Sequence, residues 1–467
     1  SAWANHHENK LAGIMDRFAN EDAAAQYEAR RELAAYVANA TAPGKKDGAE
    51  KVTKELLGYL GDRTVEHEAK KYIIRDLARV GTGAAVSPLS KIMLGKDSLL
   101  AESARQALEQ MSDKRATAVF RKAISGAKND ATRQRYIRSL ANRQDSSTLS
   151  YFTKGLSSND TLLALESVYA LTKMGNTKSS TALEKAYDAG PAPELRLELE
   201  RSVVALATTD DSTLLQIANA GISSANRQAA LGRLVESDHA QSNHLLSSAI
   251  AGSDARLRAT ALRLALENGK QSLVQSQVRN FSSNDWRIVL GELHAFDPAV
   301  AEKLALQALT HSETGIQSEG LRALGTYGTA RSIDPVLEHF SGRDKELQLA
   351  ATYAVARMPG NPMTSRVNKL LKSESHEDRV LGIQLLAHRN VPNAKGKLFK
   401  FINDDNASLA REALKTLSTT ANEEDLYKLL FLARRSAEPL KNTITGMLKK
   451  VAGEIGSLEL QAKVSAL

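Results

Sequence analysis

The largest concentration of residues that could bind a ligand is a run of positive charge between residues 114 and 143. Nine lysines and arginines in this run face a single acidic residue, Asp130, so the run carries +8, equal to the formal net charge of the whole chain. Guanidinium and ammonium groups bind phosphates and carboxylates. The run therefore predicts a patch for an anionic partner, with the candidate residues Arg115, Arg121, Lys122, Arg133, Arg135, Arg138 and Arg143. The alternative is a solvated helix face.

Nucleic acid, anionic lipid headgroups, acidic polysaccharide and acidic protein would all fit such a patch. Proteins that read nucleic-acid bases usually add aromatic side chains for stacking. The aromatic residues of the run are Phe120 and Tyr136, and both fall at spacings typical of core positions. The sequence thus leaves phosphate-backbone binding open and predicts no base readout.

No residue pattern in the sequence indicates catalysis, a metal or a cofactor. The chain has no cysteine, which excludes disulfides, thiolate metal sites and a cysteine nucleophile. A Walker phosphate loop, a nucleophile elbow and a His-Glu-x-x-His zinc motif are also missing from the sequence. Gly81-Thr82-Gly83 lacks the third glycine of a dinucleotide loop and is expected to end a helix. We therefore predict no catalytic, cofactor-binding or metal-binding residues.

The elements that position the basic run are expected to be helices. Aromatic residues make up only 5% of the chain and prolines number 10, whereas good helix formers such as Ala, Leu, Lys and Glu are frequent. Runs with the two-residue alternation of β-strands are missing. No window approaches about 18 consecutive apolar residues, the length that a transmembrane helix requires. The composition predicts an all-α chain without significant β structure or a transmembrane segment.

A phrase built around a leucine, in several repeats preceded by a small residue such as alanine, recurs through the chain and closes a helix each time. Examples are IIRDLARVG at Leu77, SVYALTKMG at Leu171 and GLRALGTYG at Leu324. We call this leucine, or the residue in its place, the marker. The twelve markers are spaced by 27–35 residues and are Leu77, Leu108, Leu140, Leu171, Leu206, Leu234, Leu266, Leu293, Leu324, Ala356, Leu386 and Leu417. About 31 residues hold two helices of three turns with short connections, so each repeat is expected to be a helical hairpin.

Residue types between the helices support this interpretation. N-capping residues are expected where the second helix of a hairpin begins, at Asn129-Asp130, Asn159-Asp160, Ser253-Asp254, Asn284-Asp285 and Asp404-Asp405. Left-handed C-caps are expected just after the markers, at Gly81, Gly175, Gly269, Gly328 and Gly360. The repeats fill residues 48–420. Residues 1–47 are expected to form an N-terminal helical cap and residues 421–467 a C-terminal helical cap and tail, because a terminal repeat exposes one face to water.

In period and pattern these repeats resemble the HEAT-like, armadillo-type family of α-solenoids, over residues from about 50 to 435. The resemblance implies about 12–13 stacked antiparallel helix pairs in a right-handed superhelix. It also implies a non-enzymatic scaffold or binding protein, a subunit of a larger assembly, that holds a macromolecular partner on the solenoid surface. A protein partner is expected first; self-association, nucleic acid or another anionic polymer stay open.

Two other functions fit the same sequence. A HEAT-like lyase or DNA base-excision enzyme would need ionisable side chains that converge on neighbouring second helices. A phosphate-backbone binder would use residues 114–143. The missing cysteines and the start at Ser1-Ala2-Trp3 favour export to the periplasm or the extracellular space after signal-peptide removal, and an exported structural subunit that stacks with its copies. A cytoplasmic protein that lost its initiator methionine is the alternative.

Overall fold

The computed structural model describes residues 2–19, 22–45, 47–80, 82–206, 209–456, 458 and 462. These residues form 28 α-helices joined by short connections, some of which contain a single 3-10 turn, and they include no β-strand. The prediction of an all-α chain is confirmed. No helix in the described part of the chain is both long and apolar enough to cross a membrane.

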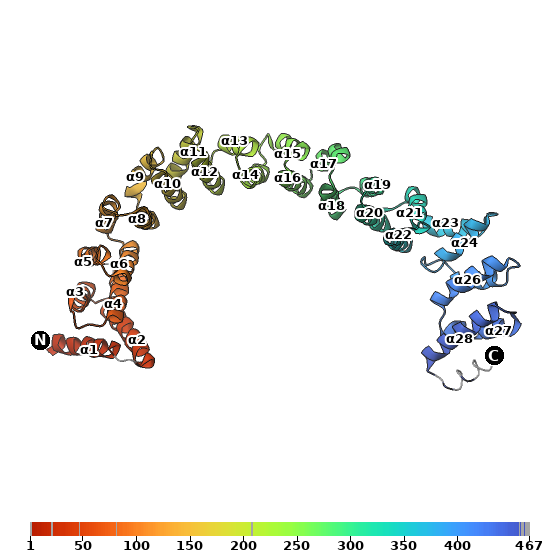
Figure 1. Ribbon diagram of the computed structural model, residues 1–467, viewed down its shortest axis with the longest axis horizontal. Helices are drawn as coiled ribbons and strands as arrows, with labels where there is room; N and C mark the ends of the chain where they lie inside the picture. Colours follow the sequence, from red (N-terminus) through yellow and green to blue (C-terminus); the bar gives the residue numbers. More distant parts are fainter. Residues whose placement is uncertain are drawn as a thin grey trace. The chain divides into compact units, whose positions relative to one another are not determined.

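The chain divides into two compact units, which we call the N-terminal unit (Ser1–Leu245) and the C-terminal unit (Leu246–Leu467). In each unit the helices alternate between two layers, as Figure 1 shows, and we call the odd-numbered helices first helices and the even-numbered ones second helices. The helix α15 (Ser242–Ala251) contains the boundary between the units.

In the N-terminal unit the first helices are α1 (Ala2–Phe18), α3 (Gly48–Gly61), α5 (Val86–Met93), α7 (Lys114–Ser125), α9 (Leu149–Gly155), α11 (Thr177–Asp188) and α13 (Asp211–Ala220). Its second helices are α2 (Ala23–Ala40), α4 (His67–Val80), α6 (Ser98–Gln110), α8 (Asp130–Asn142), α10 (Thr161–Met174), α12 (Pro193–Ala205) and α14 (Ser224–Glu236).

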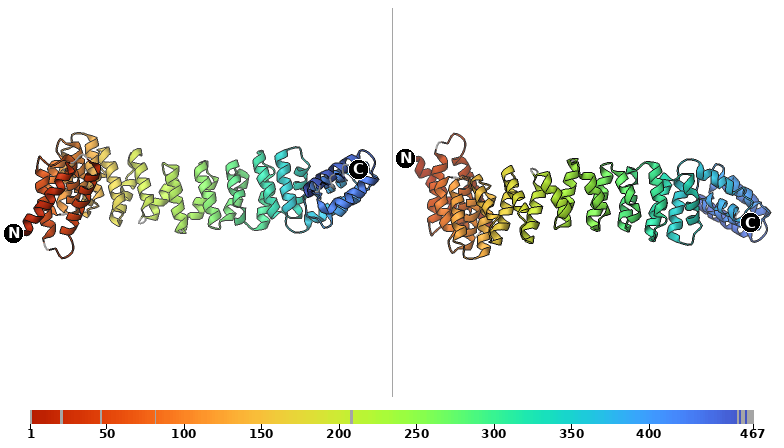
Figure 2. Two further views of the ribbon diagram at one scale, coloured as in Figure 1. Left: turned by 90° about the horizontal axis from the view of Figure 1, so that it is seen from below. Right: turned by 90° about the horizontal axis from the view of Figure 1, so that it is seen from above.

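In the C-terminal unit the first helices after α15 are α17 (Gln271–Gln277), α19 (Pro298–Ala308), α21 (Ile333–Phe340), α23 (Pro362–Leu370), α25 (Ala394–Ile402) and α27 (Leu426–Arg435). Its second helices are α16 (Ala255–Glu267), α18 (Ser283–Gly291), α20 (Thr314–Tyr327), α22 (Lys345–Arg357), α24 (His376–Leu385), α26 (Ala407–Thr420) and α28 (Leu440–Ile455). The hairpins of each unit lie side by side (Figure 2), so a second helix such as α8 or α20 contacts the second helix before it and the one after it.

The markers form the core between the layers. Eleven of the twelve are buried, each on a second helix or within two residues of its end. The exception is Ala356, which is exposed, whereas Val355 beside it is fully buried. The prediction at Ala356 is wrong because the apolar face of α22 continues at four-residue steps from Leu347 through Ala351 to Val355. Val355 restores a spacing of 31 residues to the markers on both sides.

Most predicted capping residues begin the helices that they were assigned to. Asn129, Asp160 and Asp254 are the N-caps of α8, α10 and α16, and their side chains accept hydrogen bonds from backbone amides of the first turn. The predictions at residues 284–285 and 404–405 are wrong by two residues and one residue, respectively. The N-cap of α18 is Ser282, with Asp285 completing a capping box, and the N-cap of α26 is Asn406. Serine and asparagine side chains cap as well as aspartate does, so residue type alone did not fix the position.

The predicted glycine caps need glycine for different reasons. Gly175 ends α10 in the left-handed region with φ 59°, and Gly269 and Gly360 also have positive φ, as predicted. Gly81 lies outside the described residues. The prediction is wrong for Gly328, which is extended with φ −66°, but a Cβ atom there would lie 2.4 Å from the carbonyl oxygen of Leu324. Close packing, not backbone conformation, requires glycine at that position.

Arginines that follow one second helix bind the carbonyl groups that end the previous one. Arg389 donates from Nη1 to the carbonyls of residues 355, 356 and 358, at 3.2, 3.2 and 2.7 Å, and from Nη2 to that of residue 360 at 2.8 Å. Arg143 binds the carbonyls of residues 108, 111 and 113 in the same way. The last carbonyls of a helix have no donor within the helix. Each arginine side chain therefore supplies hydrogen-bond donors to the terminal carbonyls of the hairpin before its own.

A buried carboxylate also joins neighbouring second helices. Glu166 of α10 is 4% exposed and accepts hydrogen bonds from Gln134 Nε2 at 2.6 Å and Arg138 Nε at 2.9 Å, both on α8. A charge that is buried between helices stabilises the contact only when such donors surround it.

Asp76 of α4 lacks donors of this kind. Its side chain is fully buried, and neither carboxylate oxygen accepts a hydrogen bond in the part of the chain that the structure describes. The nearest cations are Arg79 Nη1 at 3.5 Å and Arg75 Nε at 3.8 Å. Burial raises the pKa of Asp76 above its ordinary value, against the opposing charge of the two arginines.

Arg389→Met removes the charge and five hydrogen bonds, including one to Thr364, and keeps a long side chain. Because carbonyl groups then lose their donors, we expect the free energy of unfolding of the C-terminal unit to fall by about 2–3 kcal/mol. Urea denaturation followed by circular dichroism measures it. Arg343→Met, at an exposed arginine, is the matched control and should change stability by less than about 0.5 kcal/mol. Equal losses in both variants would contradict the role of Arg389.

Asp76→Asn is expected to raise the melting temperature of the N-terminal unit at pH 7. An acid whose folded pKa lies above its unfolded pKa costs stability, and this cost grows as pH rises from the unfolded value through the folded one. The advantage of the variant should therefore shrink toward pH 3. Glu166→Gln, which weakens a satisfied pair, should lower stability by about 1–3 kcal/mol instead. Calorimetry at both pH values measures these shifts; a lower melting temperature for Asp76→Asn at pH 7 would refute the assignment.

Candidate binding surfaces

The hairpin of α7 and α8 divides the predicted basic patch between the two layers (Figure 1). The first helix α7 carries Arg115, Arg121 and Lys122, and the second helix α8 carries Arg133, Arg135 and Arg138. Arg143 is the C-cap of α8. The structure therefore places six of the seven residues in two separate groups, one in each layer, and Arg143 at the end of α8. Binding of an anionic partner by these residues stays a prediction.

The group on α8 is largely paired with carboxylates. Arg133 Nη1 lies 2.6 Å from Asp160 Oδ2, the N-cap of the next second helix. Arg138 donates to Glu166, which raises the pKa of the Arg138 guanidinium. Its guanidinium carbon also lies 5.4 Å from the ring centre of Tyr169. Arg135 is exposed. Two of the three arginines on this face thus hold α8 against α10.

The group on α7 is more open to solvent. Arg115 binds Asp113 through Nε at 3.1 Å and Nη2 at 2.8 Å, and these hydrogen bonds lower the pKa of Asp113 to about 2. Arg121 donates from Nη2 to the carbonyl of Ser147 at 2.8 Å. Lys122 is exposed. This face therefore presents cations that a ligand could reach.

Three other residues of the basic run, Arg143, Phe120 and Tyr136, serve the core. Arg143 is committed to the carbonyls that end α6. Phe120 is fully buried and Tyr136 is 9% exposed, with their ring centres 6.5 Å apart. The prediction that both rings occupy core positions is confirmed, and neither ring presents a face for a base to stack on.

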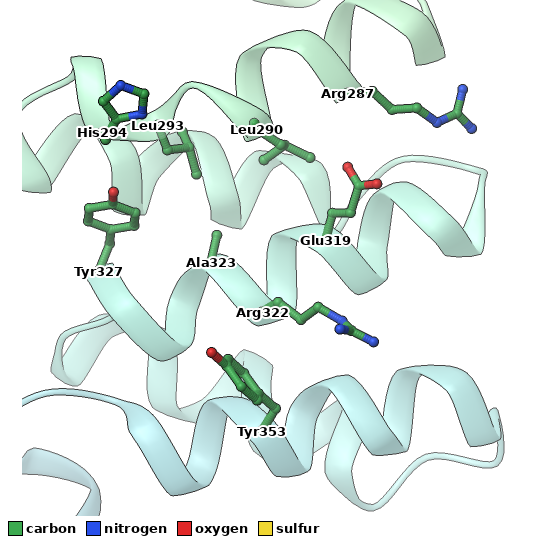
Figure 3. A pocket seen from close by; sticks show the side chains of 10 residues that line it. Arg287, Leu290, Leu293, His294, Glu319, Arg322, Ala323, Tyr327 and Tyr353 are labelled. Carbon is green, nitrogen blue, oxygen red and sulfur yellow. The ribbon is translucent and has the colours of Figure 1, made fainter.

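A second candidate surface lies in the C-terminal unit, where a hollow of about 480 Å³ opens along the second helices α18, α20 and α22. We call it the α18–α22 groove. Figure 3 shows its apolar floor between these helices, with charged and aromatic side chains around it. The lining residues are Arg287, Leu290, Gly291, Leu293, His294, Glu319, Arg322, Ala323, Tyr327 and Tyr353.

The rim of the groove mixes both signs of charge with aromatic rings. Arg287 and Arg322 lie at one end near Glu319, and His294 and Tyr327 lie at the other (Figure 3). Tyr353 is 41% exposed. Its ring centre lies 5.3 Å from the guanidinium carbon of Arg357, so a cation covers part of one face.

Charged and ionisable side chains at the rim of the groove are open to water. The side chain of His294 is 74% exposed and that of Arg287 is 52% exposed, although Arg287 Nη2 lies 2.8 Å from Glu313 Oε2. Catalytic electrostatics is strongest in sites from which water is excluded. Exposed tyrosines and arginines over an apolar floor suit the binding of a macromolecule better.

Sequence reasoning missed this groove, although the repeat contains a signal for it. Arg322 lies two positions before the marker Leu324, and Tyr353 lies two positions before Val355. The same position holds exposed Arg138 and Tyr169 in the N-terminal unit. The marker points into the core, so the residue two before it, about 200° around the helix, points away from the core. Reading that position along the repeats would have revealed the outer face of the second helices.

The family of HEAT repeats matches residues 117–203. No curated protein sequence matches the chain at a significant level. Among solved structures, the chain is similar to an engineered protein at 17% identity and a TM-score of 0.24, covering 79% of this chain and 98% of that one. It is also similar to Kap121p bound to RanGTP at 11% identity and a TM-score of 0.47, covering 97% of this chain and 57% of that one.

A further similarity is to Kap95p in a complex with Ran, at 11% identity and a TM-score of 0.33, covering 98% of this chain and 62% of that one. The chain thus spans between 57% and 62% of the length of these two proteins. Likeness at this level does not carry function from one protein to another. The family match assigns residues 117–203 to HEAT repeats, and the described helices before and after them continue the same two-layer α-solenoid pattern.

Proposed function

We propose that this chain is a binding scaffold that holds a segment of a protein partner in the α18–α22 groove. The observation that supports it is the composition of the groove: an apolar floor that includes Leu290 and Ala323, under a rim that presents Tyr353 and Arg322 to solvent. Tyrosine and arginine are enriched among the residues that contribute most to protein–protein binding energy.

A protein partner fits this rim better than a polyanion does. Exposed Glu319 lies beside Arg322 and Arg287, and Arg287 is already paired with Glu313. A protein surface that binds a phosphate backbone presents many cations that are not paired with carboxylates. A segment of mixed polarity can place apolar side chains on the floor and pair both signs of charge at the rim.

The alternatives have less support from the arrangement of side chains. The basic run does not form one continuous surface for a phosphate backbone. Its candidate residues fall in two layers, and several already bind carboxylates or carbonyl groups. An enzyme of the lyase or base-excision type would need ionisable groups that are shielded from water, and those of the α18–α22 groove are exposed. Export from the cytoplasm and the domain bounds at residues 47 and 420 stay predictions.

The experiment compares recovery of partners from an extract of the source organism on the immobilised wild type, Tyr353→Ala and Arg322→Ala. Each variant is expected to retain a specific protein at least about tenfold less than the wild type does, which corresponds to about 1.4 kcal/mol. Quantitative mass spectrometry measures the retention. The partner should stay bound to the wild type at about 0.5 M salt, because ion pairs do not dominate the groove.

Tyr427→Ala is the matched control, since Tyr427 is 83% exposed on α27, outside the groove. This variant should retain as much partner as the wild type. Circular dichroism should show the same melting curve for all four proteins. Undiminished recovery by both groove variants, or recovery of nucleic acid that is lost at high salt, would rule out the proposed function.

A further inference from the structure

A groove in the first-helix layer of the N-terminal unit has no place in the proposed function. It lies between the neighbouring first helices α5 and α7 and encloses about 580 Å³; we call it the α5–α7 groove. Its lining residues are Gly83, Val86, Ser87, Ser90, Lys91, Leu94, Arg115, Ala118, Val119, Lys122, Ala123 and Gly126. Most of these side chains are small, which leaves room between the two helices.

The charged residues that line the α5–α7 groove are all basic. Lys91, Arg115 and Lys122 are exposed at its edges, and none of the described lining residues is acidic. Two of these cations belong to the basic run at residues 114–143. An anionic group that enters the groove would meet Lys91 and Lys122, and at the edge Arg115 together with its partner Asp113.

Arg115 is held in place before any ligand arrives. Asp113 binds its Nε and Nη2 atoms, which fixes the plane of the guanidinium group and leaves Nη1 without a bond to this carboxylate. The guanidinium also lies where a side chain on residue 83 would be, because a Cβ atom on Gly83 would come 1.4 Å from Arg115 Nη2. Glycine at position 83 therefore makes room for Arg115 at the edge of the groove. A fixed guanidinium binds a carboxylate at a smaller entropic cost than a mobile one.

The floor of the groove is apolar and not aromatic. Val86 and Ala123 are buried at its base, and Leu94 is 60% exposed at the end of α5. None of the described lining residues carries an aromatic ring for stacking a nucleic-acid base. The floor instead suits aliphatic side chains of a helix that lies along the groove.

From this combination we propose that the α5–α7 groove docks an acidic amphipathic helix of a protein partner. Aliphatic side chains on one face of that helix contact Val86, Val119 and Leu94. Glutamates or aspartates on its flanks pair with Lys91 and Lys122 along the helices and with Arg115 at the end of the groove. The length of α7, 12 residues, matches a docked helix of about three turns.

The probe is a fluorescein-labelled helical peptide of about 14 residues, with leucines on one face and glutamates on both flanks. Fluorescence anisotropy with the full chain should give a Kd in the micromolar range. Lys91→Glu with Lys122→Glu is expected to weaken binding at least about tenfold, and so is about 0.5 M salt. Ala118→Trp, which fills the groove without a change of charge, should weaken binding similarly.

The matched control pair is Lys128→Glu with Arg135→Glu, which changes the net charge equally at exposed residues outside the groove. It should bind the peptide as the wild type does, and so should Tyr353→Ala of the α18–α22 groove. No binding by the wild type, or equal loss in the control pair, overturns the proposal. A peptide in which lysine replaces each glutamate should not bind. The proposal is also overturned if this basic peptide binds as well as the acidic one and a single-stranded oligonucleotide displaces the acidic peptide.

Discussion

A helical hairpin of this chain cannot bury its apolar face by itself, and the rest of the structure follows from that constraint. Within a unit, a second helix is covered by other second helices, as α20 is by α18 and α22. Markers such as Leu324 reach complete burial only within this stack. Polar groups also depend on the neighbouring hairpin. Arg389 donates the hydrogen bonds that the carbonyl groups at the end of α22 lack within their own helix. Stability therefore accumulates from interfaces between neighbours.

Stacking also decides which residues are available to a partner. The markers must face inward, so the residues two positions before them face outward and form the surface of the second helices. In the C-terminal unit this surface contains Arg322 and Tyr353 of the α18–α22 groove. The first-helix layer presents different residues, and the α5–α7 groove there is basic and aliphatic. The two grooves, one on first helices and one on second helices, thus differ in chemistry.

The sequence was sufficient to predict the architecture, because a leucine every 31 residues has few physical explanations other than stacked hairpins. It was insufficient where one residue type serves several purposes. Glycine at position 328 is required by packing against Leu324 and not by its backbone angle. Alanine at position 356 is compatible with either face of α22. The basic run was predicted as one patch because sequence proximity conceals the fact that α7 and α8 lie in different layers. The α18–α22 groove joins residues from three repeats, and only the register between repeats places them together.

The dependence of each hairpin on its neighbours is tested most directly by amide hydrogen exchange on a chain that ends at residue 420. This truncation removes α27 and α28 and exposes the face of α26 that contacts α28. If stacking holds the fold together, exchange protection should fall most in α25 and α26, less in α23 and α24, and not at all in α3 to α14. Unchanged protection in α25 and α26 would show that a hairpin supports itself, and would contradict this account of the fold.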